Sequence, residues 1–310
     1  MNNKNILLLG GFGFIGTNIL KYVDSELDGY TVTVFDKLPK HPYGVTFNCV
    51  KKVYAGDFGD TASLRPVFEN DKFDFIIHAI SSTVPATSSN FRYDIESNLI
   101  ATIELLRLLV EYDQKNIIYL SSGGAIYGKT NEMQKHKEID SAFPLSSYGI
   151  VKLAIEKYLS LFYERYQLRP LILRLSNPFG PYHFSMKQGI VNVALRSAKE
   201  HKSFVVWGDG KAKKDYIFIN DFCDILFKLI EIYPVNEIIN IGSSHSLSVN
   251  DILKEVSRLF PTFVWSYKSF EQFDVPYFEL DTRKLLALIG DYQFTPFEEG
   301  LLETKNWLLK

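Results

Sequence analysis

The sequence has only two cysteines in 310 residues, Cys49 and Cys223. Two cysteines supply neither a disulfide framework nor the ligand set of a metal site, and they suit a reducing compartment. We therefore expect no bound metal and a cytoplasmic protein.

Long apolar runs and an excess of charge of one sign are also missing. No apolar run is long enough to span a membrane. The apolar stretch near the start lacks a small-residue cleavage site, so we expect no signal peptide. The formal net charge is only -2, which disfavours a nucleic-acid partner. Internal repeats and low-complexity linkers are absent as well, so two lobes of this chain should be interleaved rather than tethered.

What the sequence does have is a glycine-rich turn close to its start. Residues 6–9 are an unbroken apolar run, which is typical of a strand buried on both faces of a parallel sheet. Gly10, Gly13 and Gly16 follow, and an amphipathic pattern that includes Ile15 predicts a helix. Glycine permits positive φ and a close approach to a pyrophosphate, which the N–H groups of the helix N-terminus then bind. The arrangement indicates a dinucleotide site.

A carboxylate ends the next predicted strand, residues 30–36. Asp36 lies about twenty residues past the last glycine, where dinucleotide folds place the residue that binds the adenosine ribose. A carboxylate there accepts hydrogen bonds from both ribose hydroxyls and repels a 2′-phosphate. The sequence therefore predicts NAD rather than NADP as the cofactor.

Strands and helices alternate along the first half of the chain. Further strands are predicted at residues 50–54, 73–80, 115–120 and 170–175, with a helix at 98–110. Asp57, after the third strand, either accepts from the adenine amino group or caps a helix that starts near Thr61. His78 is expected to be a packed strand residue rather than a catalyst. This alternation predicts an α/β fold with a parallel sheet.

The second half of the chain is less regular. We expect a helix at 188–198, a short strand at 204–207 and a turn at 208–210. Residues 237–242 read as a late strand that returns to the main sheet. Helices at 249–260 and 282–289 belong to a small second lobe.

A tyrosine and a lysine begin the helix after the fifth strand, which is expected to run to about Tyr166. Tyr148 and Lys152 are four positions apart, so they lie on one helix face. An ammonium beside a phenol stabilises the phenolate and lowers the tyrosine pKa, which makes a general base. Because the same chain carries a dinucleotide-binding motif upstream, Tyr148 and Lys152 are the expected catalytic pair.

Together these residues resemble the extended short-chain dehydrogenase/reductase family, in its nucleotide-sugar epimerase/dehydratase branch. The resemblance covers essentially the whole chain. It rests on GGFGFIG, Asp36, Gly56-Asp57, Asn98, SSGGAIYG, the Tyr148/Lys152 pair, RLSNPFGP, GDG…KDYIFIND (208–221), FDVP (273–276) and the closing LDTRK…EEGL…TKNW.

The resemblance implies a Rossmann-type doubly wound parallel sheet with a smaller, interleaved C-terminal substrate lobe. The NAD-binding domain would comprise residues 1–176 and 215–245, and the substrate lobe 177–214 and 246–310. Family members commonly dimerise through helices represented here by 98–110 and 146–166, so we expect a homodimer.

The resemblance also assigns roles to single residues. Tyr148 would be the acid/base, and Lys152 would bind the nicotinamide ribose. The expected cofactor contacts are Gly10, Gly13, Phe14, Ile15, Gly16, Asp36, Asp57, Phe58, Ala79, Ile80, Ser121, Tyr148 and Lys152. The expected substrate contacts are Ser82, Thr83, Asn177 (sugar or diphosphate), Gln188, Trp207 (nucleotide base) and Lys214.

Three positions depart from the family pattern. Gly123 stands where the family has a serine or threonine hydroxyl that bonds the reacting sugar oxygen. Lys214 replaces a diphosphate-binding arginine and so loses the bidentate fork. Glu271 occupies the place of a second arginine, just before FDVP. Lys213 or Lys268 would have to compensate.

The loop after the fifth strand narrows the reaction. Dehydratases and decarboxylases of this type carry acidic residues after the serine or threonine position, where Gly124 and Ala125 stand here. Ala125 also supplies no thiol or second base for deprotonation beside a ketone. What remains is reversible hydride transfer at one sugar carbon.

The leading hypothesis is therefore an NAD-dependent nucleotide-sugar 4-epimerase acting on a UDP-hexose or its N-acetyl derivative, through a transient 4-keto sugar. The alternatives are a 4-ketoreductase of deoxysugar biosynthesis and a catalytically silent NAD-binding protein. Asp36 disfavours the reductase, because net reductions usually use NADPH. We expect another hydroxyl to replace the one missing at Gly123, from Ser122 or from Ser82 or Thr83 at the end of the fourth strand.

Overall fold

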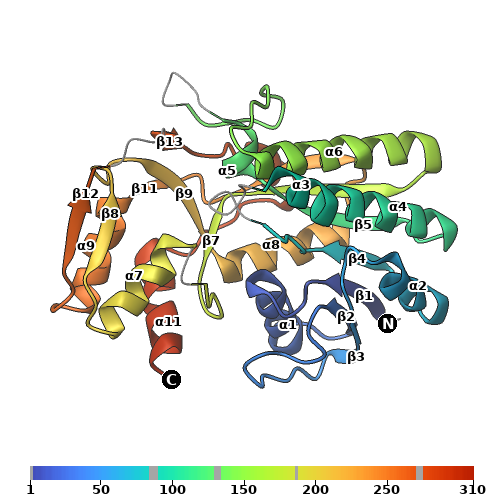
Figure 1. The fold of residues 1–310 in the computed structure, drawn as a ribbon, viewed down its shortest axis with the longest axis horizontal. Helices are drawn as coiled ribbons and strands as arrows, with labels where there is room; N and C mark the ends of the chain where they lie inside the picture. The colour runs from blue at the N-terminus through green and yellow to red at the C-terminus, as the bar shows by residue number, and fades with distance from the viewer. Residues whose placement is uncertain (1–2, 84–89, 129–133, 186–187, 270–274) are drawn as a thin grey trace. The chain divides into compact units, whose positions relative to one another are not determined.

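The computed structural model describes residues 3–83, 90–128, 134–185, 188–269 and 275–310 (Figure 1). They form two compact units, each built from separate stretches of the chain. The first unit consists of the residues up to Ile126, Pro144–Arg174 and Leu229–Ile239, and the second of Tyr127–Phe143, Leu175–Lys228 and Asn240–Lys310. The assignment of cofactor and substrate to separate domains stays a prediction.

A seven-stranded sheet with the order β10-β6-β5-β4-β1-β2-β3 organises the first unit. Its strands are β1 (Lys4–Leu9), β2 (Tyr30–Asp36), β3 (Val50–Ala55), β4 (Phe75–His78), β5 (Asn116–Ser122), β6 (Arg169–Leu175) and β10 (Glu237–Ile241). β1 pairs in parallel with both β2 and β4, so the strand order reverses beside β1. This confirms the predicted doubly wound sheet, in which ligands bind beyond the strand ends at that reversal.

The helices of the first unit cover both faces of the sheet, because its central strands are continuous apolar runs. On one face, strand residues such as Leu7, Leu9 and Ile117 form a core with Leu105 and Leu159 of the helices. That layer consists of α2 (Thr61–Asn70), α4 (Ala101–Glu111) and α6 (Ser147–Tyr166). In Figure 1, α4 and α6 lie on one side of β4 and β5, and α1 (Phe14–Glu26) lies on the other. The sheet is therefore buried on both faces.

The helix expected at 98–110 begins earlier than predicted. The chain first forms α3 (Phe91–Asp94), whose N-cap Asn90 accepts a hydrogen bond from the Tyr93 N–H at 3.1 Å. A π-helical segment, η2 (Ile95–Ile100), then leads into α4. The wider π turn interrupts the 3.6-residue periodicity on which the sequence prediction depended.

Two expectations about single residues of this unit are decided by the structure. The cap of α2 is Asp60, which accepts from the Ala62 N–H at 3.0 Å, so the helix-capping alternative for Asp57 was wrong. His78 is confirmed as a packed strand residue: it is buried and its Nε2 lies 3.0 Å from the Thr102 hydroxyl. Its side chain therefore points toward α4, which carries Thr102.

The second unit contains two small sheets. The first joins β11 (Ser246–Ser248), β9 (Lys213–Phe218) and β13 (Tyr277–Phe278), and β7 (Asn177–Phe179) also pairs with β9. The second pairs β8 (Phe204–Trp207) in parallel with β12 (Trp265–Lys268). Its helices are α7 (Ile190–Lys199), α9 (Val249–Leu259), α10 (Arg283–Ile289), α11 (Phe297–Leu309) and the first part of α8 (Ile219–Ile232). The late strand predicted at 237–242 is confirmed as β10 of the main sheet.

A buried carboxylate fixes the loops of the second unit around β9. Asp215 is fully buried and accepts hydrogen bonds from the Leu280 N–H at 3.1 Å and from the Ser243 N–H and hydroxyl at 3.0 and 3.2 Å. Burial raises the pKa of Asp215 to about 6. Asp215 therefore holds three chain segments together at the cost of burying a carboxylate.

Within the described ranges, no helix is long and apolar enough to cross a membrane. The same residues contain no group of three or more His, Cys, Asp or Glu side chains placed to hold a metal ion.

Candidate active site

The glycine turn between β1 and α1 has the geometry that a pyrophosphate needs. Gly10 has a φ of +85°, and a Cβ at Gly16 would lie 2.2 Å from the Gly10 carbonyl oxygen. A Cβ at Gly13 would meet only that same oxygen, at 3.5 Å, so the turn is open on its outer side. The first turn of α1, which starts at Phe14 and Ile15, has no side-chain cap. Its N–H groups and helix dipole therefore face the open side, where an anion would bind.

Asp36 lies at the end of β2, beside the glycine turn. Its Oδ2 accepts from the Phe12 N–H at 2.9 Å and its Oδ1 from the Leu38 N–H at 3.1 Å. These two bonds fix the carboxylate in place and leave lone pairs on both oxygens. Such a carboxylate suits a ribose diol, which donates two hydrogen bonds.

The other predicted cofactor residues of the first unit lie around the same strand ends. A Cβ at Gly10 would lie 3.0 Å from Ile80 Cγ1 and 3.3 Å from the Ala79 carbonyl carbon. Asp57 accepts from the Gly59 N–H at 2.9 Å, and Phe58 is buried. The end of β4 thus approaches the glycine turn closely, and these residues fit a bound dinucleotide. With the pyrophosphate cradle and Asp36, they fit NAD.

The predicted catalytic pair lies at the start of α6, over the end of β5. The Lys152 ammonium donates to the Leu120 carbonyl at 2.8 Å and lies 5.7 Å from the centre of the Tyr148 ring. Burial lowers the pKa of Lys152 to about 7, and the nearby Glu156 carboxylate opposes that effect. The ammonium and the phenol are therefore neighbours, as the four-residue spacing predicted.

The expected lowering of the Tyr148 pKa is not what the protein alone produces. Burial raises the pKa of Tyr148, and hydrogen bonds with the hydroxyls of Ser122 and Ser81 oppose that rise. Both hydroxyls favour the phenolate, because each can donate to it. The residues that support the tyrosine are thus two serines, one from β5 and one from the segment after β4.

These serines bear directly on the hydroxyl missing at Gly123. Ser122 was predicted as a substitute, and Ser81 was not. Ser82 is exposed, and its backbone N–H donates to the Asn98 side chain at 2.8 Å. Thr83 is buried, and its hydroxyl accepts from the Asn98 amide at 3.4 Å. The run of three hydroxyl residues pointed to this corner, but only the fold shows which of them reaches Tyr148.

A buried network that the sequence did not reveal lies one helical turn beyond Lys152. Glu156 accepts from the Ser121 hydroxyl at 2.6 Å and forms an ion pair with Arg174 at 2.7 Å. All three side chains are buried. The only sequence signal was the continued four-residue spacing from Tyr148 through Lys152 to Glu156.

Ser82 and Thr83 belong to the first unit, and the other predicted substrate residues belong to the second. The Asn177 amide donates to the Asp215 carbonyl at 2.8 Å, and the Lys214 ammonium donates to the Val275 carbonyl at 2.7 Å. Gln188 is exposed, and its N–H donates to the Ser185 hydroxyl at 3.1 Å. Glu271 lies outside the described residues.

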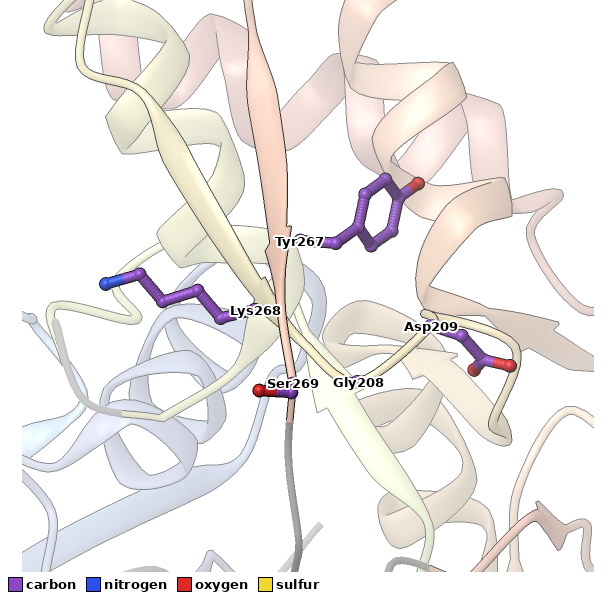
Figure 2. Close-up of a pocket in the computed structure, with 5 residues that line it drawn as sticks. All are labelled: Gly208, Asp209, Tyr267, Lys268 and Ser269. Carbon is purple, nitrogen blue, oxygen red and sulfur yellow. The ribbon is translucent and has the colours of Figure 1, made fainter.

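Trp207 and Lys268 form an exposed aromatic and cationic surface in this unit. They are register partners of β8 and β12, and the Lys268 ammonium lies 5.7 Å from the Trp207 ring centre. Trp207 is 61% exposed. A hollow of about 380 Å³ adjoins them, lined by Gly208, Asp209, Tyr267, Lys268 and Ser269. Figure 2 shows Lys268 and Tyr267 on opposite sides of β12, as the pleat of a strand requires.

Comparisons with known proteins agree with this geometry. A family model described as "NAD dependent epimerase/dehydratase family" matches residues 6–242. The chain is 29% identical over 314 residues to a putative UDP-glucose 4-epimerase of Methanocaldococcus jannaschii, covering 98% of each. It is 27% identical over 257 residues to the dTDP-4-dehydro-6-deoxyglucose reductase of Escherichia coli, covering 82% of this chain and 81% of the relative. A crystal structure of UDP-glucose 4-epimerase with UDP-glucose from Thermotoga maritima matches with a TM-score of 0.90 and 27% identity over 98% of both chains.

Proposed function

Since the chain belongs to the NAD-dependent epimerase/dehydratase family, we propose that it is a nucleotide-sugar 4-epimerase acting on a UDP-hexose or a UDP-N-acetylhexosamine. The observation that carries the proposal is the composition of the site around Tyr148. The phenol is bonded by Ser122 and Ser81, and the adjoining loop offers Gly124 and Ala125 where dehydration would need an acid. The similarity to UDP-glucose 4-epimerases over nearly the whole chain supports it.

The protein's part in this reaction is proton transfer and positioning. Bound NAD supplies the acceptor, and then the donor, of the hydride at C4 of the sugar. Tyr148 takes the proton of the 4-hydroxyl and returns it after the 4-keto sugar has turned over in the site. Ser122 and Ser81 stabilise the phenolate form that accepts this proton. Lys152 holds the nicotinamide ribose.

On the substrate side, the second unit supplies the groups suited to a nucleotide diphosphate. Trp207 offers an exposed ring for the base. Lys214 already donates to a backbone carbonyl and lacks the fork of the arginine it replaces. We assign the compensating cation to Lys268, which stands beside Trp207. Asn177 and Gln188 complete the proposed contacts.

A nucleotide-sugar 4-ketoreductase is the second candidate, favoured by the similarity to the Escherichia coli reductase. Asp36 counts against it, because its carboxylate repels the 2′-phosphate of NADPH. A catalytically silent NAD-binding protein is the third. The two serine hydroxyls that bond Tyr148 count against that hypothesis, because a protein without catalytic activity would not need groups that stabilise a phenolate.

The test is to incubate the protein with NAD and, one at a time, UDP-glucose, UDP-galactose and their N-acetyl derivatives, and to identify products by NMR. Interconversion at C4 without net consumption of NAD supports the proposal. Tyr148→Phe is the matched control, because it removes one oxygen and should abolish turnover while NAD still binds. Net oxidation of NADH by a 4-keto-6-deoxy sugar nucleotide, with no epimerisation, would favour the reductase.

A further inference from the structure

Three consecutive residues of β5 each bind one residue of a single stripe on α6. The Leu120 carbonyl accepts from Lys152, and the Ser121 hydroxyl donates to Glu156. The Ser122 hydroxyl bonds Tyr148. The three helix residues are four positions apart, so they lie one above the other on one face. The end of β5 and the start of α6 are thus fastened at three successive points.

Glu156 is the most buried of the three helix residues, and it also contacts the strand β6. Arg174 of β6 donates to it through Nη2 at 2.7 Å and through Nε at 3.1 and 3.3 Å. Glu156 is 1% exposed and Arg174 is 3% exposed. A buried pair of this kind is costly to break, because removing one partner leaves a buried charge without its counterpart. The carboxylate therefore joins α6 to β5 and β6 in one arrangement.

We propose that Glu156 is the positioning residue of the Tyr148/Lys152 pair: its carboxylate, shared between Ser121 and Arg174, holds the helix stripe in register with the end of β5 and supports the charged form of Lys152. The assignment rests on the proposed use of Tyr148 and Lys152. Glu156 acts through Lys152 and contacts neither sugar nor cofactor.

The effect of Glu156 on the charge of Lys152 follows from the groups that surround the ammonium. Burial lowers the pKa of Lys152, and Glu156 raises it. The ionisable groups that interact with Lys152 or Glu156 are His78 of β4, Tyr119 of β5, Arg174 of β6 and Tyr148 of α6 itself. The elements packed against α6 carry further ionisable residues: Arg92, Tyr93 and Asp94 of α3, Glu96 of η2, and Glu104, Arg107 and Glu111 of α4. His78 stays neutral, because burial lowers its pKa to about 3. Removing the charge of Glu156 would leave Arg174 as an unbalanced cation near Lys152, which would lower the Lys152 pKa further.

The experiment measures NADH affinity against pH by fluorescence titration of the full chain. A charged Lys152 donates more strongly to the ribose hydroxyls, so affinity should fall as the pH rises through the Lys152 pKa. Glu156→Gln should move the midpoint of this fall down by on the order of one pH unit. Arg174→Met, which removes the cation paired with the Glu156 carboxylate and leaves the Ser121 hydrogen bond in place, should move it up. The double variant should return it close to the parent midpoint. Glu164→Gln, the same change at an exposed position of α6, is the control and should not move it.

Three results would overturn the proposal: a midpoint unmoved in Glu156→Gln and Arg174→Met, an equal shift in Glu164→Gln, or a fall that persists in Lys152→Met. If Glu156→Gln does not fold, Arg174→Met alone tests the proposal, through the expected upward shift in the pH midpoint of NADH affinity. Turnover gives a second readout, in which Glu156→Gln should lower kcat and leave KM unchanged. If no sugar nucleotide is converted by the parent, the proposed function fails, while the NADH midpoints still decide the role of Glu156.

Discussion

Replacing Ser81 or Ser122 by alanine should slow turnover far more at neutral than at alkaline pH. Both hydroxyls bond Tyr148, whose pKa burial raises. A hydrogen bond to a charged group contributes about 1.5–3 kcal/mol, which corresponds to roughly 10-fold to 150-fold in rate. Each substitution should therefore raise the Tyr148 pKa by on the order of one to two units. Since the phenolate is the base, kcat at pH 7 should fall by about that factor.

The pH dependence separates this explanation from simple damage to the site. Below the Tyr148 pKa, the rate depends on the fraction of phenolate, so the deficit of each variant should shrink as the pH approaches the raised pKa. The assay is kcat between pH 6 and 10 for Ser81→Ala, Ser122→Ala and the control Ser25→Ala, at an exposed serine of α1. Substrate KM should change little. The reasoning fails if both variants match Ser25→Ala, or if their deficits are the same at every pH.

Three further predictions concern the cofactor, the assembly and the second unit. Calorimetry should show much tighter binding of NAD(H) than NADP(H), and Asp36→Ser should narrow the difference; equal affinities in the parent would contradict the role of Asp36. Ile150 and Leu161 of α6 are exposed, so Ile150→Asp or Leu161→Asp should convert a dimer to a monomer in light scattering, whereas Ile139→Asp should not. A monomeric parent would exclude the dimer. Burial raises the pKa of Asp215 to about 6, above about 3.9 in an unfolded chain, so its stabilisation is complete below pH 4 and is lost as the pH rises through 6. The free energy of unfolding in urea should lose about 3 kcal/mol over that interval from this group, and equal slopes in the parent and Asp215→Asn would refute it.

Local patterns in the sequence were enough to predict the main sheet. β2 has the expected bounds, because its consecutive β-branched residues, Thr31–Val34, are followed by Asp36 at the turn. The glycine spacing also predicted the turn before α1 correctly. The π turn at Ile95–Ile100 could not be predicted, since its extra residue disrupts the periodicity that marks a helix.

The candidate site was predicted in outline and not in its contacts. The spacing of Tyr148 and Lys152 fixes their common face on any helix. By contrast, Ser81 and Glu156 matter only because the ends of β4 and β5 and the strand β6 come together around α6. Those contacts join residues far apart in the sequence, so no local pattern records them. The pairing of the short strands around β9 escaped prediction for the same reason.

The place of β10 in the sheet affects how the chain is made as well as how it folds. β6 and β10 are neighbours, yet about sixty residues, most of them in the second unit, separate Leu175 from Glu237. During synthesis at about 5–20 residues per second, the outer edge of β6 stays unpaired for roughly 3 to 12 s after that strand has emerged. An unpaired apolar edge is a template for aggregation, so we expect the nascent protein to be prone to aggregation over this interval. A synonymous change that slows translation between these two strands should lower the yield of folded protein without altering a single residue.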